Sequence, residues 1–310
     1  HTSKNVSRNV LSTPHLYNPS PYLPFPTTLW IDISGGATIE TGRKNGTGKM
    51  DLELNGKVAI VTGGSDGIGK AAAISLASEG AKVAIVGRTQ AKLDSAVNEI
   101  KAESDGSVIG VAADVSVESE VQAMIAKVVD EFGGVDILVN NAGTSSATTL
   151  EKMTDQDLET DFGIKIYGAI YCARAALPYL KSSGSGAIVN TTTPGGKAAR
   201  PGSQPTSLSR SAGISLTKSW AGELAEHNIR VNTICVGVLK SGQHRTRWEG
   251  INAKDPSYTI DDHWATFGGT VPLGRIGEAK EAGDVICFLA SGRASYITGT
   301  AINVDGGSAP

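Results

Sequence analysis

Short apolar runs alternate with longer amphipathic stretches from Lys57 to the end of the chain. The apolar runs have the length and β-branched content of strands and cover residues 57–61, 82–86, 108–112, 135–139, 187–190, 229–234 and 301–304. The intervening stretches predict helices over residues 68–78, 91–102, 118–131, 155–181, 207–226 and 278–289. Because each crossover helix must cover the sheet before the next strand joins it, this alternation predicts an α/β fold, a doubly wound seven-stranded parallel sheet with helices on both faces.

The first 49 residues differ in composition from the rest of the chain. They are rich in Pro, Ser, Thr and Asn, and five prolines between residues 14 and 26 interrupt any helical or strand period. We therefore expect residues 1–49 to be a disordered leader or tag, with a native disordered extension as the alternative. Residues 50–310 are expected to form a single domain.

The charge, hydropathy and cysteine content of the chain limit the kinds of molecule that it is expected to bind. The net charge of −3 comes from 28 basic and 31 acidic residues of interspersed sign, which gives no basic face for nucleic acid. No apolar run approaches the length of a membrane span. We expect a cytoplasmic protein with a small-molecule partner. No metal site or disulfide framework is expected, because the histidines lack ligand spacing and the cysteines are few and far apart: Cys172, Cys235 and Cys287.

A glycine-rich turn follows the first predicted strand. The sequence Thr-Gly-Gly-Ser-Asp-Gly-Ile-Gly over residues 62–69 runs directly into a helix. Glycines in this place allow a tight turn and close approach of the backbone to a pyrophosphate, while the helix N-terminus offers unpaired N–H groups. A mere tight turn is the alternative. We expect this turn to bind a dinucleotide through Gly63, Ser65, Asp66, Gly67, Ile68 and Gly69.

Further motifs occur in a fixed order along the chain. They are Ala-Asp-Val at 113–115, Asn-Asn-Ala-Gly at 140–143, Ile-Arg-Val-Asn at 229–232, Pro-Leu-Gly-Arg at 272–275 and Ile-Thr-Gly-Thr-Ala-Ile-Asn-Val-Asp-Gly-Gly at 297–307. With the glycine turn, they make residues 51–308 resemble the short-chain dehydrogenase/reductase family. The resemblance implies a Rossmann-like sheet, a nicotinamide dinucleotide, and a homodimer or homotetramer. It also implies that Asp114 and Val115 flank the adenine and that Asn141, Ala142 and Gly143 line the adenosine side.

The end of the second predicted strand indicates which dinucleotide is preferred. Gly87 and Arg88 stand where an acidic residue would accept hydrogen bonds from a ribose 2′-hydroxyl, and the guanidinium suits a 2′-phosphate instead. Asp66 in the glycine turn points the other way, because relatives that prefer NADP(H) often carry a basic residue there. We expect NADP(H) to be favoured over NAD(H), with a solvated surface charge as the alternative for Arg88.

The family's catalytic positions carry unusual residues. The resemblance places Thr193 at the serine position, Thr206 at the tyrosine position, Arg210 at the lysine position and Lys165 at the asparagine position. Thr193 keeps a hydroxyl, and Arg210 keeps a positive charge that could hold ribose hydroxyls. The aliphatic hydroxyl of Thr206 is far less acidic than a phenol and reaches less far, so it is a poor general acid near neutral pH.

Other groups could supply the proton. Lys165 could do so if burial lowered its pKa. Tyr167 and Tyr171 carry phenols at i,i+4 spacing, although core or subunit contacts are the more common use of such a pair. His244 lies where the family has its substrate loop, although a solvated loop histidine is the simpler interpretation.

These observations favour an oxidoreductase. We expect NADP(H)-linked chemistry on a small-molecule carbonyl or alcohol, with a non-standard proton donor. A lyase or isomerase on the same scaffold and a catalytically silent nucleotide-binding protein are the alternatives. Aromatic residues between positions 237 and 270 suit either a bulky apolar substrate or the packing of a helical lid.

Overall fold

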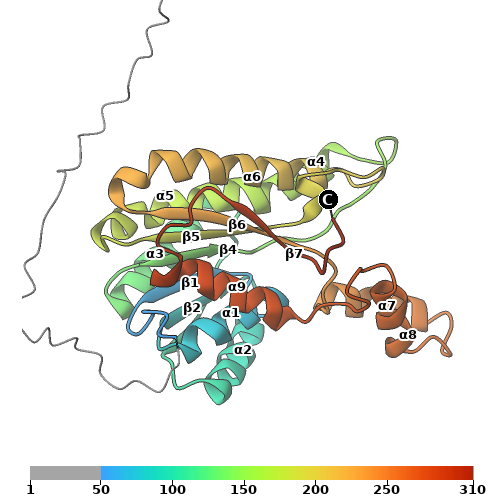
Figure 1. The fold of residues 1–310 in the computed structure, drawn as a ribbon, viewed down its shortest axis with the longest axis horizontal. Helices are drawn as coiled ribbons and strands as arrows, with labels where there is room; N and C mark the ends of the chain where they lie inside the picture. Colours follow the sequence, from blue (N-terminus) through green and yellow to red (C-terminus); the bar gives the residue numbers. More distant parts are fainter. Residues whose placement is uncertain (1–49, 310) are drawn as a thin grey trace, which may run out of the picture. The chain divides into compact units, whose positions relative to one another are not determined.

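Seven parallel strands form one sheet in the computed structural model, which describes residues 50–309 (Figure 1). The strand order is β3-β2-β1-β4-β5-β6-β7, so the direction of sheet growth reverses between β1 and β4. The fold class predicted from the sequence is confirmed. The expected leader lies outside the described residues. The strands are β1 (Val58–Thr62), β2 (Lys82–Gly87), β3 (Val108–Ala112), β4 (Ile137–Asn140), β5 (Ala187–Thr192), β6 (Arg230–Val236) and β7 (Ala301–Val304).

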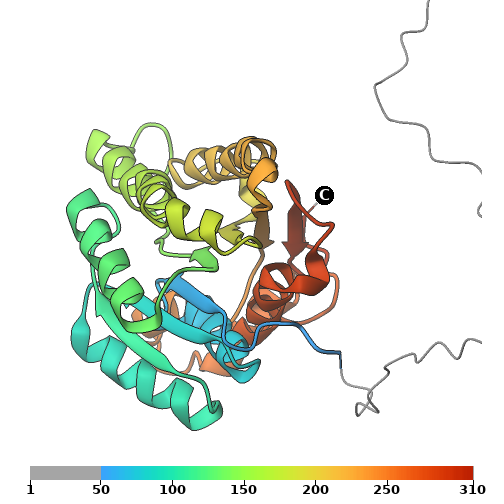
Figure 2. The same ribbon diagram turned by 90° about the vertical axis from the view of Figure 1, so that its left-hand side faces the viewer.

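Helices cover both faces of the sheet (Figure 2). Along β1, Ala59 and Val61 pack into the core on one face, and Val58 and Ile60 pack into the core on the other. Both sets are buried because a parallel sheet covered on two sides has no solvent face. The first core is shared with α1 (Gly67–Ser78), α2 (Gln90–Glu103) and α9 (Ala279–Ala290). The second is shared with α3 (Glu118–Phe132), α5 (Gly168–Ser182) and α6 (Thr206–Glu223).

The predicted helix over residues 155–181 is divided. It consists of α4 (Asp155–Phe162), a π-helical turn η1 (Gly163–Tyr167) and α5. A Thr154–Asp157 capping box fixes the start of α4. Hydrophobic periodicity does not reveal a π turn, because the chain stays helical through it. The turn carries Lys165, and single π turns are frequent at functional sites.

Strands β5 and β6 each end two residues later than predicted, and two further helices are present. Thr191 and Thr192 extend β5 by pairing with Ile234 and Cys235 of β6, although their polar side chains gave no apolar signal. Residues 237–270 contain α7 (Gly242–Asn252) and α8 (Ile260–Gly268), which we had not predicted. Short 3-10 turns η2 (Pro194–Gly196), η3 (Ala225–His227) and η4 (Gly292–Ala294) complete the elements.

Residues 50–309 contain neither a membrane-spanning helix nor a cluster of metal-ligating side chains. No helix there is long and apolar enough to cross a membrane. The same residues contain no group of three or more His, Cys, Asp or Glu side chains placed to hold a metal ion. All three cysteines are buried, and none of them forms a disulfide.

The contact between α1 and α9 yields a stability prediction. A Cβ added at Gly283 would lie 2.7 Å from the carbonyl carbon of Ala71, a backbone atom that cannot easily move. We expect Gly283→Ala to lower the free energy of unfolding by about 1–3 kcal/mol through overpacking, measured by urea denaturation. Gly222→Ala in α6 is the matched control, because a Cβ there meets no heavy atom within 4 Å. It should be neutral or stabilising by about 0.4–1 kcal/mol, and equal effects of the two substitutions would contradict the assignment.

Candidate active site

The glycine turn lies between the end of β1 and the start of α1. Gly63 and Gly67 have φ values of 65° and 54°, a region that glycine adopts without strain. Asp66 caps α1, and its carboxylate accepts a hydrogen bond of 2.7 Å from the backbone N–H of Gly67. A Cβ at Gly69 would lie 2.2 Å from the carbonyl oxygen of Gly63, so only glycine fits there. The turn is thereby held tight against the helix N-terminus, the geometry that suits a pyrophosphate.

Residues 140–143 brace this turn from the neighbouring strand. The hydroxyl of Thr62 accepts hydrogen bonds from the backbone N–H groups of Asn141 and Ala142, at 2.9 and 3.0 Å. The Asn141 amide donates in turn to the carbonyl oxygen of Thr62 at 3.0 Å. Asn141 therefore serves to hold the turn, in addition to bordering the cavity beside it.

A cavity of about 220 Å³ lies on the β2 side of the turn. Arg88, Thr89 and Lys92 form one wall, and Asp114 and Val115 form another. Gly63, Ser65, Ala142 and Gly143 also border it, as expected for the adenosine side. Burial acts to raise the pKa of Asp114, but hydrogen bonds from Ser116 and the charge of Arg88 outweigh it and lower the pKa. A positive charge is thus close to the predicted adenine-binding aspartate.

A second cavity of about 320 Å³ opens on the other side of the turn. Asp66, Gly67, Ile68 and Asn141 border it near the glycine turn, and Gly63 and Gly143 border both cavities. Thr193, Arg210 and His244 border it further along. Among the described residues, the Thr193 hydroxyl donates no hydrogen bond and accepts none, so it is free to bind a ligand oxygen.

A buried ion pair lies behind this cavity. Asp161, at the end of α4, accepts a hydrogen bond from the ammonium of Lys165, and both side chains are almost fully buried, at 0% and 3% exposure. Ser209 of α6 donates a further hydrogen bond to Asp161. The Thr206 hydroxyl lies 3.2 Å from Oδ2 of Asp161 and 3.4 Å from Nζ of Lys165.

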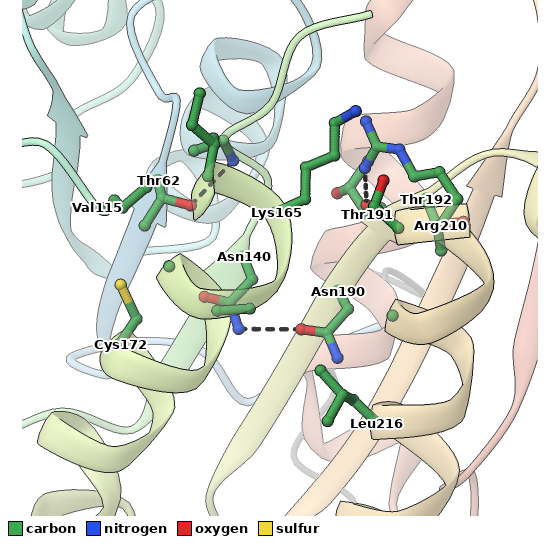
Figure 3. A pocket seen from close by; sticks show the side chains of 16 residues that line it. Thr62, Val115, Asn140, Lys165, Cys172, Asn190, Thr191, Thr192, Arg210 and Leu216 are labelled. Atoms are coloured by element: carbon green, nitrogen blue, oxygen red, sulfur yellow. Dashed lines mark hydrogen bonds between the residues drawn. The ribbon is translucent and has the colours of Figure 1, made fainter. Parts of the chain in front are cut away.

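Arg210 connects the ion pair to the second cavity. Figure 3 shows its guanidinium beside the Lys165 ammonium, and its Nη1 donates a hydrogen bond of 2.6 Å to the carbonyl oxygen of Thr191. No protein partner of its Nε is found in residues 50–309. The guanidinium also approaches Gly143, where an added Cβ would lie 3.2 Å from Nη2. Arg210 borders the second cavity, so guanidinium N–H groups that are not bonded to Thr191 can reach a ligand there.

Burial next to a second cation changes the acidity of both basic groups. Desolvation, and then the charge of Arg210, lower the pKa of Lys165 to about 8, although Asp161 acts in the opposite direction. Desolvation lowers the pKa of Arg210 to about 10, which leaves it charged at neutral pH. Lys165 is therefore the group in this cluster whose proton is exchangeable near neutral pH.

The structure brings Lys165, Thr206 and Arg210 into one cluster, and Thr193 borders the same cavity as Arg210. Thr206 is partly exposed but borders neither of the two larger cavities. Tyr167 and Tyr171 stack on each other with ring centroids 6.3 Å apart, and neither borders a cavity of the site.

Sequence analysis missed two members of the site. Asp161 and Ser209 were not predicted, although Asp161 precedes Lys165 by four residues, a spacing that brings side chains together on a helix. That spacing was the available signal for Asp161. Ser209 had none, because it comes from a segment distant in the sequence.

The ion pair yields a second stability prediction. Asp161→Asn should lower the free energy of unfolding by about 3–5 kcal/mol, because it leaves the Lys165 ammonium buried without a counter-charge. Replacing both partners, as Asp161→Leu with Lys165→Met, should recover a large part of this loss in urea denaturation. The control is Asp284→Asn, whose partner Lys280 is exposed, with an expected effect of about 0–1 kcal/mol. Equal losses for the two single variants would contradict the buried pairing.

Comparison with known proteins places this geometry in a family. The family model described as enoyl-(acyl carrier protein) reductase matches residues 63–309. The 3-oxoacyl-[acyl-carrier-protein] reductase FabG of Thermotoga maritima is 34% identical over 256 residues, which are 83% of this chain and 99% of the relative. The 3alpha-hydroxysteroid dehydrogenase of Mediterraneibacter gnavus is 36% identical over 258 residues, which are 83% of this chain and 98% of the relative.

Solved structures agree with the sequence relatives. L-sorbose reductase from Gluconobacter frateurii, crystallised in complex with NADPH and L-sorbose, matches with a TM-score of 0.79 and 31% identity, covering 84% of this chain and 98% of the other. Levodione reductase matches with a TM-score of 0.75 and 29% identity, covering 82% and 97%. The sheet order, the glycine turn and these matches over nearly the whole described region show that the chain belongs to the short-chain dehydrogenase/reductase family of oxidoreductases.

Proposed function

We propose that the protein is an NADP(H)-linked oxidoreductase that reduces a small-molecule carbonyl, with its proton held by Lys165. The observation that carries this proposal is the contact of 3.4 Å between Nζ of Lys165 and Oγ1 of Thr206. Thr206 occupies the family's tyrosine position, and its short side chain is backed by an ammonium that can replace the phenol as proton source.

Residues of the first cavity, the capping role of Asp66 and a related structure support NADP(H). The Arg88 guanidinium and the Lys92 ammonium offer two positive charges to a 2′-phosphate, and Gly87 provides no carboxylate for a 2′-hydroxyl. The Asp66 carboxylate, whose negative charge would repel a 2′-phosphate, accepts a hydrogen bond from the N–H of Gly67. L-sorbose reductase, crystallised with NADPH, is a family member of the same fold.

Each residue of the site has a separate role in the proposed reduction. Bound NADPH would supply the hydride for the carbonyl carbon. The Thr193 hydroxyl donates a hydrogen bond to the carbonyl oxygen and fixes its direction. Lys165 holds the proton that this oxygen takes up, while Thr206 and Asp161, both within hydrogen-bond reach of the ammonium, keep it in place. Arg210 holds ribose hydroxyls, because it stays charged and has donors to spare.

Cofactor preference is tested at Arg88. Arg88→Ala should weaken NADPH binding by about 10–100-fold, because a charge-assisted hydrogen bond contributes about 1.5–3 kcal/mol, and should leave NADH binding within about twofold. Titration calorimetry measures both constants. Lys101→Ala, in the last turn of the following helix α2 and not among the residues that border the cavity, is the control. A wild-type protein that binds NADH more tightly than NADPH would refute this choice of cofactor.

The proton source is tested by the pH dependence of NADPH oxidation with a panel of ketones. Reduction needs the protonated ammonium, so kcat should fall as pH rises through about 8, the pKa of Lys165. Lys165→Met should lower kcat by about 10²–10⁴-fold and remove this limb of the profile. Lys181→Met, at the exposed end of α5, should change neither. Substrate turnover without any change in cofactor absorbance would instead indicate a lyase or isomerase.

A further inference from the structure

The α7–α8 segment contains a chain of polar rings that leads from the surface to the second cavity. The Tyr258 hydroxyl lies 3.4 Å from Nδ1 of His263, and Nε2 of His263 lies 3.4 Å from Nδ1 of His244. His263 is fully buried, Tyr258 is partly exposed, and His244 borders the cavity shared with Thr193 and Arg210. Hydrogen bonds of this length are common in ligand-free sites and shorten when a ligand binds.

Both imidazoles are neutral at physiological pH. Burial, followed by the charges of Arg247 and His263, lowers the pKa of His244 to about 4, and burial and Arg247 lower that of His263. A neutral imidazole has one N–H donor and one acceptor nitrogen, so each contact in the chain fixes the next. The protons of Tyr258, His263 and His244 can therefore be arranged along this row of hydrogen bonds in only two ways.

The phenol decides between these arrangements. A phenol O–H is a strong donor, and an imidazole nitrogen is a strong acceptor, so Tyr258 donates to Nδ1 of His263. The competing acceptor, Oγ1 of Thr266 at 3.5 Å, is on the exposed side of α8, where water can satisfy it. His263 must then carry its proton on Nε2 and donate to Nδ1 of His244. His244 in turn carries its proton on Nε2, for which no partner is found in residues 50–309.

We propose that His244 is a specificity-determining residue that donates a hydrogen bond from Nε2 to a second oxygen of the substrate. Arg210 and Thr193 lie along the same cavity, so a molecule whose carbonyl oxygen meets Thr193 can present a more distant oxygen to His244. The substrate class is a carbonyl compound with a further carbonyl, hydroxyl or ether oxygen. This inference rests on the proposed function for the choice of the reacting group, but the tautomer chain does not depend on it.

The donor state is tested on the cofactor-free, full-length protein by two-bond ¹H–¹⁵N correlation spectra with ¹⁵N-labelled histidine. His244 and His263 should both appear as neutral rings protonated on Nε2. Tyr258→Phe should shift both away from this single tautomer, whereas His227, at the far end of α6, should be unaffected. A proton on Nδ1 of His244 in the wild type, or tautomers unchanged by Tyr258→Phe, would overturn the inference.

Substrate selection provides the second readout. Cyclohexane-1,4-dione and cyclohexanone differ in one distant oxygen, and the ratio of their kcat/KM values with NADPH measures recognition of that oxygen. His244→Leu should lower the ratio about tenfold or more, and His244→Gln, whose amide keeps an N–H donor at a similar distance, should retain most of it. An unchanged ratio in His244→Leu would overturn the specificity role. If neither ketone is turned over although NADPH binds, the proposed function fails and the tautomer spectra alone decide the inference.

Discussion

The candidate site depends on the burial of two cations beside one carboxylate. Lys165 and Arg210 lie side by side under the sheet's carboxyl edge, and Asp161 is the counter-charge that makes their desolvation tolerable. Because an isolated ammonium would be costly in such surroundings, the position of Asp161 determines where Lys165 can sit. The same surroundings lower the pKa of Lys165 into the range where a proton can be given up. In the function that we propose, Lys165 is the proton source and Arg210 keeps a positive charge next to the two cavities.

The parallel sheet provides the frame for this cluster. Its direction of growth reverses between β1 and β4, and ligands of open α/β sheets bind outside the strand ends at such a point. Thr62 bonds the end of β1 to the residues after β4, so the glycine turn and the Asn-Asn-Ala-Gly segment are held as one unit. Arg210 approaches Gly143 of this unit from α6, which places the buried cluster directly beside the two cavities.

The segment formed by α7 and α8 differs from the rest of the core in the type of side chain that it buries. Elsewhere the buried residues are mostly aliphatic, but α7 and α8 pack around imidazoles and other aromatic rings, with His263 4.8 Å from Phe267 between ring centroids. Aromatic rings that also carry polar atoms can fill a core. In a row of such rings, the donor or acceptor role of one ring also sets the role of the next. The wall of the second cavity formed by His244 therefore has a defined polarity, which an aliphatic lid would lack.

The sequence by itself determined the architecture and the position of the glycine turn that we expect to bind a nucleotide. Apolar runs of strand length and a glycine turn between strand and helix depend on local backbone geometry, and such signals are contiguous in the chain. The resemblance also placed Thr206 at the family's tyrosine position, which raised the question of the proton source. Only the tertiary structure pointed to Lys165 as the proton source that we propose. Asp161, Lys165 and Thr206 come from α4, a π turn and α6, which are brought together by folding. The pKa of Lys165 depends on how deeply these elements bury its ammonium. The tautomers proposed for His244 and His263 likewise follow from contacts between α7 and α8, which no spacing along the chain specifies.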